Sequence, residues 1–129
     1  MDKIQTSSQR RLGSQEARPN LDLRPALAWV YMVTNKRAGV LYIGVTTTLG
    51  VRVRQHRSGN GSSFTKKYNC TRLVYFEAHP DVASARARER QMKAWQRSWK
   101  TNLIEQKNPE WLDIGDDVPR TPRPQPALG

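Results

Sequence analysis

The sequence predicts a single α/β domain of the α+β kind, with a small antiparallel sheet of three strands flanked by helices. Two observations predict it. Between residues 28 and 106 the side-chain patterns follow the order strand, strand, helix, strand, helix, without an internal repeat or a glycine-rich phosphate loop. A chain of 129 residues is also long enough for one compact core and too short for two. We therefore expect one functional unit.

The first two strands form a predicted hairpin. Residues 28–34 and residues 40–43 both alternate β-prone side chains, and the polar loop 35–39 between them ends in a glycine. Each strand carries one tyrosine, Tyr31 in the first and Tyr42 in the second. The pattern fits an ordinary amphipathic hairpin, and it fits one wall of an active site.

The register of this hairpin decides whether the two tyrosines share a face, because adjacent residues of a strand point to opposite sides. If Tyr31 stands opposite Tyr42 or Gly44, both rings lie on one face. If it stands opposite Ile43, they lie on different faces. The sequence leaves both possibilities open.

A short helix is predicted from residue 49 to about residue 57. Thr47 or Thr48 can cap its N-terminus and Gly59 can end it. One face of this helix carries two apolar and two polar side chains, Leu49, Arg52, Val53 and His56. Two polar groups therefore share the stripe that faces inward.

A loop that starts near Gly59 and continues through residues 64–69, of sequence FTKKYN, leads to a third predicted strand at residues 72–78. A long helix is then predicted from residue 82 to about residue 106, where the pair Asn108-Pro109 ends it. Its apolar stripe contains Val82, Ala85, Met92, Trp95, Trp99 and Leu103.

Glu89 lies on this stripe or at its margin, where packing alone would favour an apolar side chain. The tryptophans Trp95 and Trp99 have helical spacing on the stripe, so we expect them, with Trp111, to serve the core and the docking of the C-terminal region rather than base stacking.

The two ends of the chain are predicted to lie outside the domain. Residues 1–25 contain few large apolar side chains and predict a flexible N-terminal arm. Residues 116–129 contain four prolines and predict a disordered, proline-rich tail. The folded domain is accordingly expected at residues 26–115.

The charge of the chain indicates its class of partner. The formal net charge is +11, and residues 26–115 contain 15 Lys or Arg against 6 Asp or Glu. A basic folded domain attracts phosphate backbones, so nucleic acid is the leading partner class, although a solvated basic face fits the same numbers.

Cysteine content and hydropathy exclude several other classes. A single cysteine, Cys70, allows neither an internal disulfide nor a metal site built from cysteines. No stretch has the length and apolarity of a membrane span, and no secretory signal opens the chain. We therefore expect a cytoplasmic protein that does not enter a membrane.

The motifs between about Trp29 and Asp113, in their order along the chain, resemble those of the GIY-YIG nuclease superfamily, which includes the N-terminal catalytic domain of UvrC. The chain is most similar to the small stand-alone bacterial members. The resemblance rests on the tripeptides Trp29-Val30-Tyr31 and Tyr42-Ile43-Gly44, on Arg52 and His56 four residues apart, on Glu89, and on the segments FTKKYN and NPEW.

Two features depart from the family pattern. The first tripeptide is not the literal Gly-Ile-Tyr, and residues 45–47 lack the lysine that some members carry after the second tripeptide. An asparagine found in the site of some members could correspond to Asn102 or to Asn108, and the sequence assigns neither.

The resemblance implies a GIY-YIG endonuclease-like fold and a metal-dependent endonuclease acting on DNA, structure-selective or weakly sequence-specific, in DNA repair or recombination. It implies Glu89 as the ligand of Mg²⁺ or Mn²⁺, which suits a hard oxygen donor. The ordinary alternative for Glu89 is a helical ion pair with Lys93 or Arg86.

The same resemblance gives roles to the other candidate catalytic residues. Arg52 would stabilise charge on the phosphate, because its guanidinium is planar and always protonated. His56 would act as a general base or orient one. Either Tyr31 or Tyr42 would position or deprotonate the attacking water, and the choice between them stays open.

Three further basic residues, Arg54, Lys66 and Lys67, are expected to contact the nucleic-acid backbone, with Lys66 and Lys67 in a loop. A larger repair or recombination complex is a possible partner, reached through the proline-rich tail if the chain is a scaffold. The alternative function is a non-catalytic module that binds DNA or RNA and keeps the fold.

Overall fold

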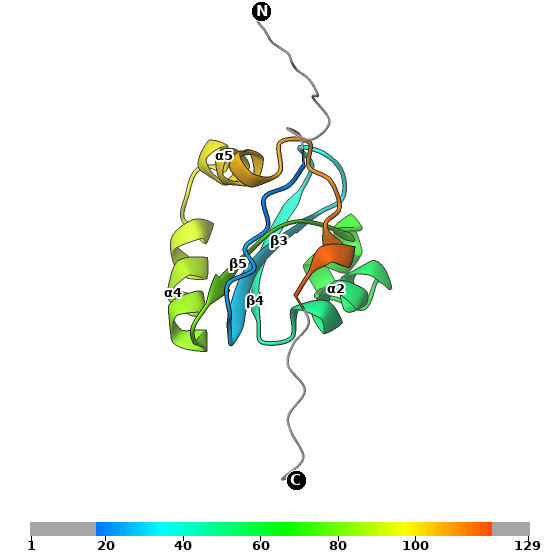
Figure 1. Ribbon diagram of the computed structural model, residues 1–129. Coiled ribbons are helices and arrows are strands. Elements are labelled where there is room, and N and C mark those ends of the chain that lie inside the picture. The colour runs from blue at the N-terminus through cyan, green and yellow to red at the C-terminus, as the bar shows by residue number, and fades with distance from the viewer. Residues whose placement is uncertain (1–17, 120–129) are drawn as a thin grey trace, which may run out of the picture.

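The computed structural model describes residues 18–119 and shows a three-stranded antiparallel sheet flanked by helices (Figure 1). The strand order in the sheet is β4-β3-β5, with β3 in the centre. This confirms the predicted fold class. The elements are β3 Ala28–Thr34, β4 Leu41–Thr46, α2 Leu49–Arg57, α3 Ser63–Tyr68, β5 Arg72–His79, α4 Val82–Lys93, α5 Arg97–Lys107 and the 3₁₀ turn η1 Gly115–Asp117.

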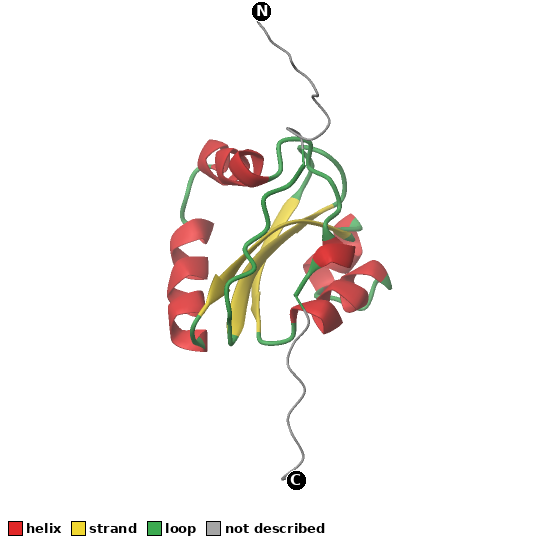
Figure 2. Ribbon diagram, viewed as in Figure 1, coloured by secondary structure: helices red, strands yellow, loops and turns green. Residues whose placement is uncertain are grey.

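The sheet is covered on both faces, as Figure 2 shows by the helices on either side of the strands. Helices α4 and α5 pack on one face, over a core that includes Val30, Met32 and Met92. Helix α2 and η1 lie on the other face, over Tyr31, Leu49 and other apolar residues. Every residue of β3 is buried, because a central strand between two layers has no solvent-facing side.

The hairpin register places Tyr31 opposite Gly44, one of the two registers that put both tyrosines on one face. Tyr42 lies two residues before Gly44, so its ring is the diagonal neighbour of Tyr31, with 6.4 Å between the ring centroids. The second strand runs over residues 41–46, whereas the sequence predicted 40–43.

The long helix predicted from residue 82 to 106 is wrong, because the chain forms two helices there. Helix α4 ends at Lys93, and Gln96 has an extended backbone, with φ −64° and ψ 156°, at the start of α5. The Arg97 guanidinium donates to the backbone carbonyls of Ala38 and Gly39 in the hairpin loop. These contacts hold the start of α5 against the hairpin.

The break changes the surroundings of the tryptophans. Trp99 is 54% exposed, so its predicted place in the core is wrong. Trp95 is partly buried against the core, and its ring lies edge-on to Trp99. Trp111 is fully buried, as expected, and its indole N–H donates to Glu105 at 2.7 Å.

Residues 63–68, predicted as a loop, form helix α3. The Ser62 side chain caps this helix by accepting from the Thr65 backbone N–H at 3.2 Å, and Asn69 closes it in the left-handed conformation, with φ 59°. Lys66 and Lys67 therefore lie on a helix rather than in a loop.

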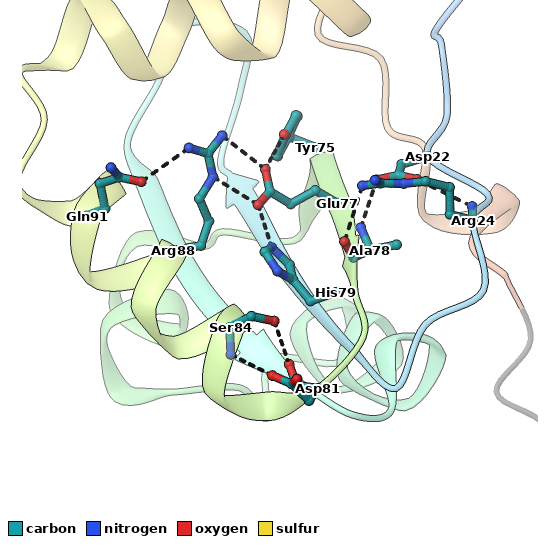
Figure 3. A network of polar contacts seen from close by, with 10 residues as sticks. All are labelled: Asp22, Arg24, Tyr75, Glu77, Ala78, His79, Asp81, Ser84, Arg88 and Gln91. Carbon is teal, nitrogen blue, oxygen red and sulfur yellow. Dashed lines mark hydrogen bonds and ion pairs between the residues drawn. The ribbon is translucent and has the colours of Figure 1, made fainter.

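Parts of both predicted terminal segments lie on the domain. Asp22 is buried; its carboxylate accepts from the Ala78 backbone N–H at 2.9 Å and from Arg24 at 2.8 Å (Figure 3). Asp116, in the predicted tail, belongs to η1 and pairs with Arg57 at 2.7 Å. The rest of the predicted arm, residues 1–17, and of the tail, residues 120–129, lies outside the described residues.

A buried carboxylate joins α4 to the sheet. Glu77 on β5 accepts hydrogen bonds from the hydroxyl of Tyr75 and from Arg88 Nε at 3.0 Å, and it lies 2.6 Å from the ring nitrogen of His79 (Figure 3). Burial alone would raise the pKa of Glu77, but these hydrogen bonds hold it below its usual value. The network fixes which side of α4 faces β5, and Glu89 is the next residue on that helix.

Within residues 18–119, no helix has the length and apolarity needed to cross a bilayer.

Candidate active site

Tyr31 lies in the middle of the sheet face covered by α2 and is only 1% exposed. Its hydroxyl is 3.0 Å from Nε2 of His56. A Cβ atom at Gly44 would come within 2.6 Å of this hydroxyl, so the absence of a side chain there lets the Tyr31 ring lie across the edge strand. The spacing of Tyr31 and Gly44 in the motif thus has a steric cause.

The pKa of Tyr31 lies well above its usual value. Burial is the main cause, the neighbouring Tyr42 and Glu89 add to the rise, and the Arg52 guanidinium opposes it. The charges of Arg52 and Glu89 therefore both act on this hydroxyl, although the two residues come from α2 and α4 on opposite faces of the sheet.

His56 is buried on α2, and its ring contacts both tyrosines, with centroid distances of 5.5 Å to Tyr31 and 5.9 Å to Tyr42. Burial lowers its pKa, and the charge of Arg52 lowers it further, so both favour the neutral imidazole. Its second ring nitrogen, Nδ1, lies 3.2 Å from Oγ1 of Thr65 on α3.

The hydrogen-bond network assigns the tautomer of His56. A threonine hydroxyl has one proton, and that of Thr65 donates to the carbonyl of Ser62 at 3.0 Å. Thr65 Oγ1 is therefore an acceptor for His56, whose Nδ1 must carry the hydrogen. Nε2 then has a free lone pair and accepts the hydroxyl proton of Tyr31.

Tyr42 is half-buried at the opening of this cluster. Its ring lies 5.9 Å from that of Phe64 on α3, and Phe64 in turn lies 4.8 Å from Tyr68. Among the residues that the structure describes, the Tyr42 hydroxyl has no hydrogen-bond partner, unlike that of Tyr31. The two tyrosines of the motif thus have different environments.

Arg52 is held beside the Tyr31 and His56 pair with one donor unused. Its Nε is buried and has no hydrogen-bond partner within the described residues. Burying such a donor costs free energy unless an acceptor is bound to it. The Arg52 side chain as a whole is half-buried, so the other donors of its guanidinium could bind an anion such as a phosphate.

Glu89 is partly buried, with 20% of its side chain exposed, and it pairs with Lys93 at 2.8 Å. The ion pair that the sequence offered as the ordinary alternative is thus present. No group of three or more His, Cys, Asp or Glu residues that could hold a metal occurs within residues 18–119. A hard cation here would have Glu89 as its single carboxylate ligand, with water and substrate oxygens completing the coordination, which is chemistry that suits Mg²⁺.

The two candidate asparagines lie elsewhere. Asn108 is buried, and its amide donates to the carbonyls of Val74 and Leu112, so it secures the turn after α5. Asn102 is exposed on α5 and lines a hollow with Trp95 and Trp99. The structure brings neither to the Tyr31 hydroxyl.

The remaining predicted contacts, Arg54, Lys66 and Lys67, are all exposed. A second basic surface, not predicted from the sequence, lies on α4, where Arg86, Arg90 and Lys93 are exposed at helical spacing beside Glu89. Their i, i+4, i+7 spacing was the available signal. Thr65 was not predicted either, since no spacing rule links a residue of one helix to its partner in the next.

Comparison with known proteins gives one family. The model of the GIY-YIG catalytic domain matches residues 27–102. A UPF0213 protein of Haloquadratum walsbyi is 36% identical over 66 residues, covering 51% of this chain and 74% of the relative. A UPF0213 protein of Staphylococcus haemolyticus is 34% identical over 79 residues, covering 61% and 95%.

One solved structure is also similar to this chain. The solution NMR structure of a UPF0213 protein from Bacillus halodurans has 29% sequence identity and a TM-score of 0.44, and the match covers 67% of this chain and 92% of that one.

Proposed function

Because the chain belongs to the GIY-YIG family of nuclease catalytic domains, we propose that it is a metal-dependent endonuclease that hydrolyses phosphodiester bonds in DNA. We propose further that its cleavage is structure-selective or weakly sequence-specific, and that it serves DNA repair or recombination. A domain of this size offers little surface for reading bases, which supports weak sequence specificity.

The observation that carries this proposal is the half-buried Arg52 side chain, whose positive charge acts on the Tyr31 hydroxyl. The guanidinium would bind the scissile phosphate and stabilise the negative charge that grows on it during attack.

Tyr31 and His56 would perform the proton transfer. As water attacks, Tyr31 accepts a proton from it and passes its own hydroxyl proton to Nε2 of His56, 3.0 Å away. The hydroxide forms a bond to phosphorus, the bond to the leaving oxygen breaks, and that oxygen takes a proton from solvent. Tyr42, half-buried at the opening, would orient the water or a phosphate oxygen.

Glu89 would hold the divalent metal that GIY-YIG nucleases generally use, and we propose Mg²⁺ or Mn²⁺. When bound, the ion would supply positive charge to the phosphate. Lys93 now pairs with Glu89 and would release it to the ion, remaining close enough to contact the DNA backbone.

The DNA backbone would lie over the exposed basic side chains around the site. Lys66 and Lys67 lie on α3, and Arg54 lies on α2. The surface of α4 adds Arg86 and Arg90, next to Glu89. Contacts of this kind give affinity and salt dependence without sequence information.

The test is nicking of supercoiled plasmid and branched DNA with Mg²⁺ or Mn²⁺. We expect Glu89→Gln to abolish cleavage while DNA binding is kept. Arg52→Ala should abolish cleavage while binding loses only one of several phosphate contacts. Glu110→Gln is the matched control, because Glu110 also pairs with a basic side chain, Arg37, at an exposed position. Binding by wild type and variants without cleavage by any of them would favour the non-catalytic binding module.

A further inference from the structure

Helix α3 exposes two aromatic rings next to the candidate active site. Phe64 is 38% exposed and Tyr68 is 40% exposed, and their ring centroids are 4.8 Å apart. Phe64 also lies 5.9 Å from Tyr42. The three rings therefore form a continuous row that starts at the site and ends at the surface.

Helix α3 has an anchor to the domain besides these two rings. Thr65 is the only buried residue of the helix, and it is anchored by His56 and by the cap at Ser62. Large aromatic rings left half-exposed beside a functional site are typical of a binding surface.

The charge around the rings favours an anionic occupant. Lys67 lies over the Tyr68 ring, with 5.3 Å from Nζ to the centroid, and Lys66 is exposed beside it. No Asp or Glu occurs in the sequence between Asp22 and Glu77. Aromatic rings among lysines, in a stretch of sequence without carboxylates, match a single nucleic-acid strand, whose bases stack while its phosphates are neutralised.

We infer that Phe64 and Tyr68 form a stacking platform for an unpaired nucleobase next to the phosphate held by Arg52. The inference rests on the proposed function and names its substrate class: DNA with an unpaired nucleotide beside the cleaved bond, as at a flap, branch or single-stranded end. Bases of an intact duplex are already stacked on one another and cannot occupy the platform.

The test compares binding of two labelled DNAs, a duplex with a single-stranded flap and the same duplex without it, by fluorescence anisotropy with the metal chelated. We expect the double variant Phe64→Ala, Tyr68→Ala to bind the flap DNA about 5- to 100-fold more weakly, as expected from loss of base stacking. Its affinity for the intact duplex should stay within about twofold of wild type. Circular dichroism confirms that the variant folds.

Matched variants separate stacking from other effects. The pair Phe64→Tyr, Tyr68→Phe keeps both rings and should bind the flap like wild type. The double variant Lys66→Ala, Lys67→Ala should weaken binding of both DNAs to the same extent and reduce the salt dependence of binding. Trp99→Ala removes an exposed ring from α5 and should change neither affinity.

Equal loss for both DNAs, or no loss for the flap, would overturn the platform. The second result would leave the rings as a contact for a protein partner. An RNA flap of the same sequence tells whether the sugar matters. The binding assay needs no cleavage, so the two proposals can fail separately. Selective binding of the flap DNA by a protein that never nicks DNA would support the platform and refute the nuclease. Cleavage of the flap DNA that is unaffected in the alanine variant would refute the platform and keep the nuclease.

Discussion

Replacing Thr65 with valine tests the proton pathway of the site. Valine has nearly the shape of threonine but cannot accept a hydrogen bond from His56 Nδ1, which lies 3.2 Å from the threonine oxygen. In the variant the Nδ1 hydrogen would be buried without a partner, at a cost of ~1–3 kcal/mol. The other tautomer avoids this cost by moving the hydrogen to Nε2, where it donates to the Tyr31 oxygen.

A cost of this size changes the ratio of the two tautomers by roughly 5- to 150-fold. Once Nε2 carries the hydrogen, Tyr31 has no group to receive its proton. We therefore expect the cleavage rate constant kcat to fall about 10- to 100-fold. KM should change little, because Arg52 and the lysines that bind the phosphates are untouched. Thr65→Ser, which restores the hydroxyl, should recover most of the rate.

The tautomer can be measured directly by long-range ¹H–¹⁵N NMR of the histidine rings, without any substrate. The chain contains two histidines, so His79, bonded to Glu77, serves as the internal control and should not change. The reasoning is refuted if wild-type His56 carries its hydrogen on Nε2, or if the valine variant keeps both the wild-type tautomer and the wild-type kcat.

Three other perturbations follow from contacts described above. Gly44→Ala puts a methyl group within 2.6 Å of the Tyr31 hydroxyl, so thermal denaturation should show a loss of ~1–3 kcal/mol and nicking should fall; an unchanged melting temperature would contradict the close approach. Glu77→Gln should destabilise the fold by ~1.5–3 kcal/mol at neutral pH, because its hydrogen bonds lose the carboxylate charge. In the folded protein the pKa of Glu77 lies below 4.5, so the stability that its carboxylate contributes is fully present above that pH and is lost as pH falls through the folded pKa. The stability of the variant should therefore vary less than that of wild type between pH 5 and 3. Parallel curves of stability against pH would refute this. Lys93→Ala frees Glu89 from its exposed partner and should lower the Mg²⁺ concentration for half-maximal nicking by up to about threefold at saturating DNA, whereas a higher requirement would argue against Glu89 as the ligand.

The strand and helix patterns of the sequence predicted the sheet and α2, but not the register of the hairpin. A repeat of two residues predicts which side chains share a face of one strand. It leaves open which residue of the neighbouring strand stands opposite each of them. The register depends on one steric fact, that the ring of Tyr31 needs a partner without a side chain, and Gly44 is that partner.

Two predictions about helices were wrong, the single helix over residues 82–106 and the loop at residues 63–68, and they have different causes. The apolar stripe continues through Trp95 and Trp99 without glycine or proline, so nothing local predicts the end of α4 at Lys93. That break accompanies contacts distant in sequence, from Arg97 to the hairpin loop. Helix α3 is too short for periodicity to reveal it, and only its capping residues Ser62 and Asn69 signalled it.

The candidate site was predictable as a set of residue types, and its organisation was not. The motif named Tyr31, Tyr42, Arg52, His56 and Glu89, and their catalytic roles stay predictions. The motif gave the two tyrosines interchangeable roles, whereas the structure gives only Tyr31 a partner for its hydroxyl. The direction of the hydrogen bond between Tyr31 and His56 depends on Thr65, whose single proton goes to the carbonyl of Ser62, and only the three-dimensional structure brings these groups together.

The Glu77 network gives neighbouring positions of α4 opposite tolerances to mutation. Arg88 points to β5 and joins the buried carboxylate, whereas Glu89, about 100° further around the helix, pairs with the exposed Lys93. In a library of single substitutions, changes at Arg88 should deplete the protein from cells because the fold is weakened. Changes at Glu89 should leave its abundance intact and remove its activity. A single step along the chain thus separates the phenotype of an unstable protein from that of an inert one.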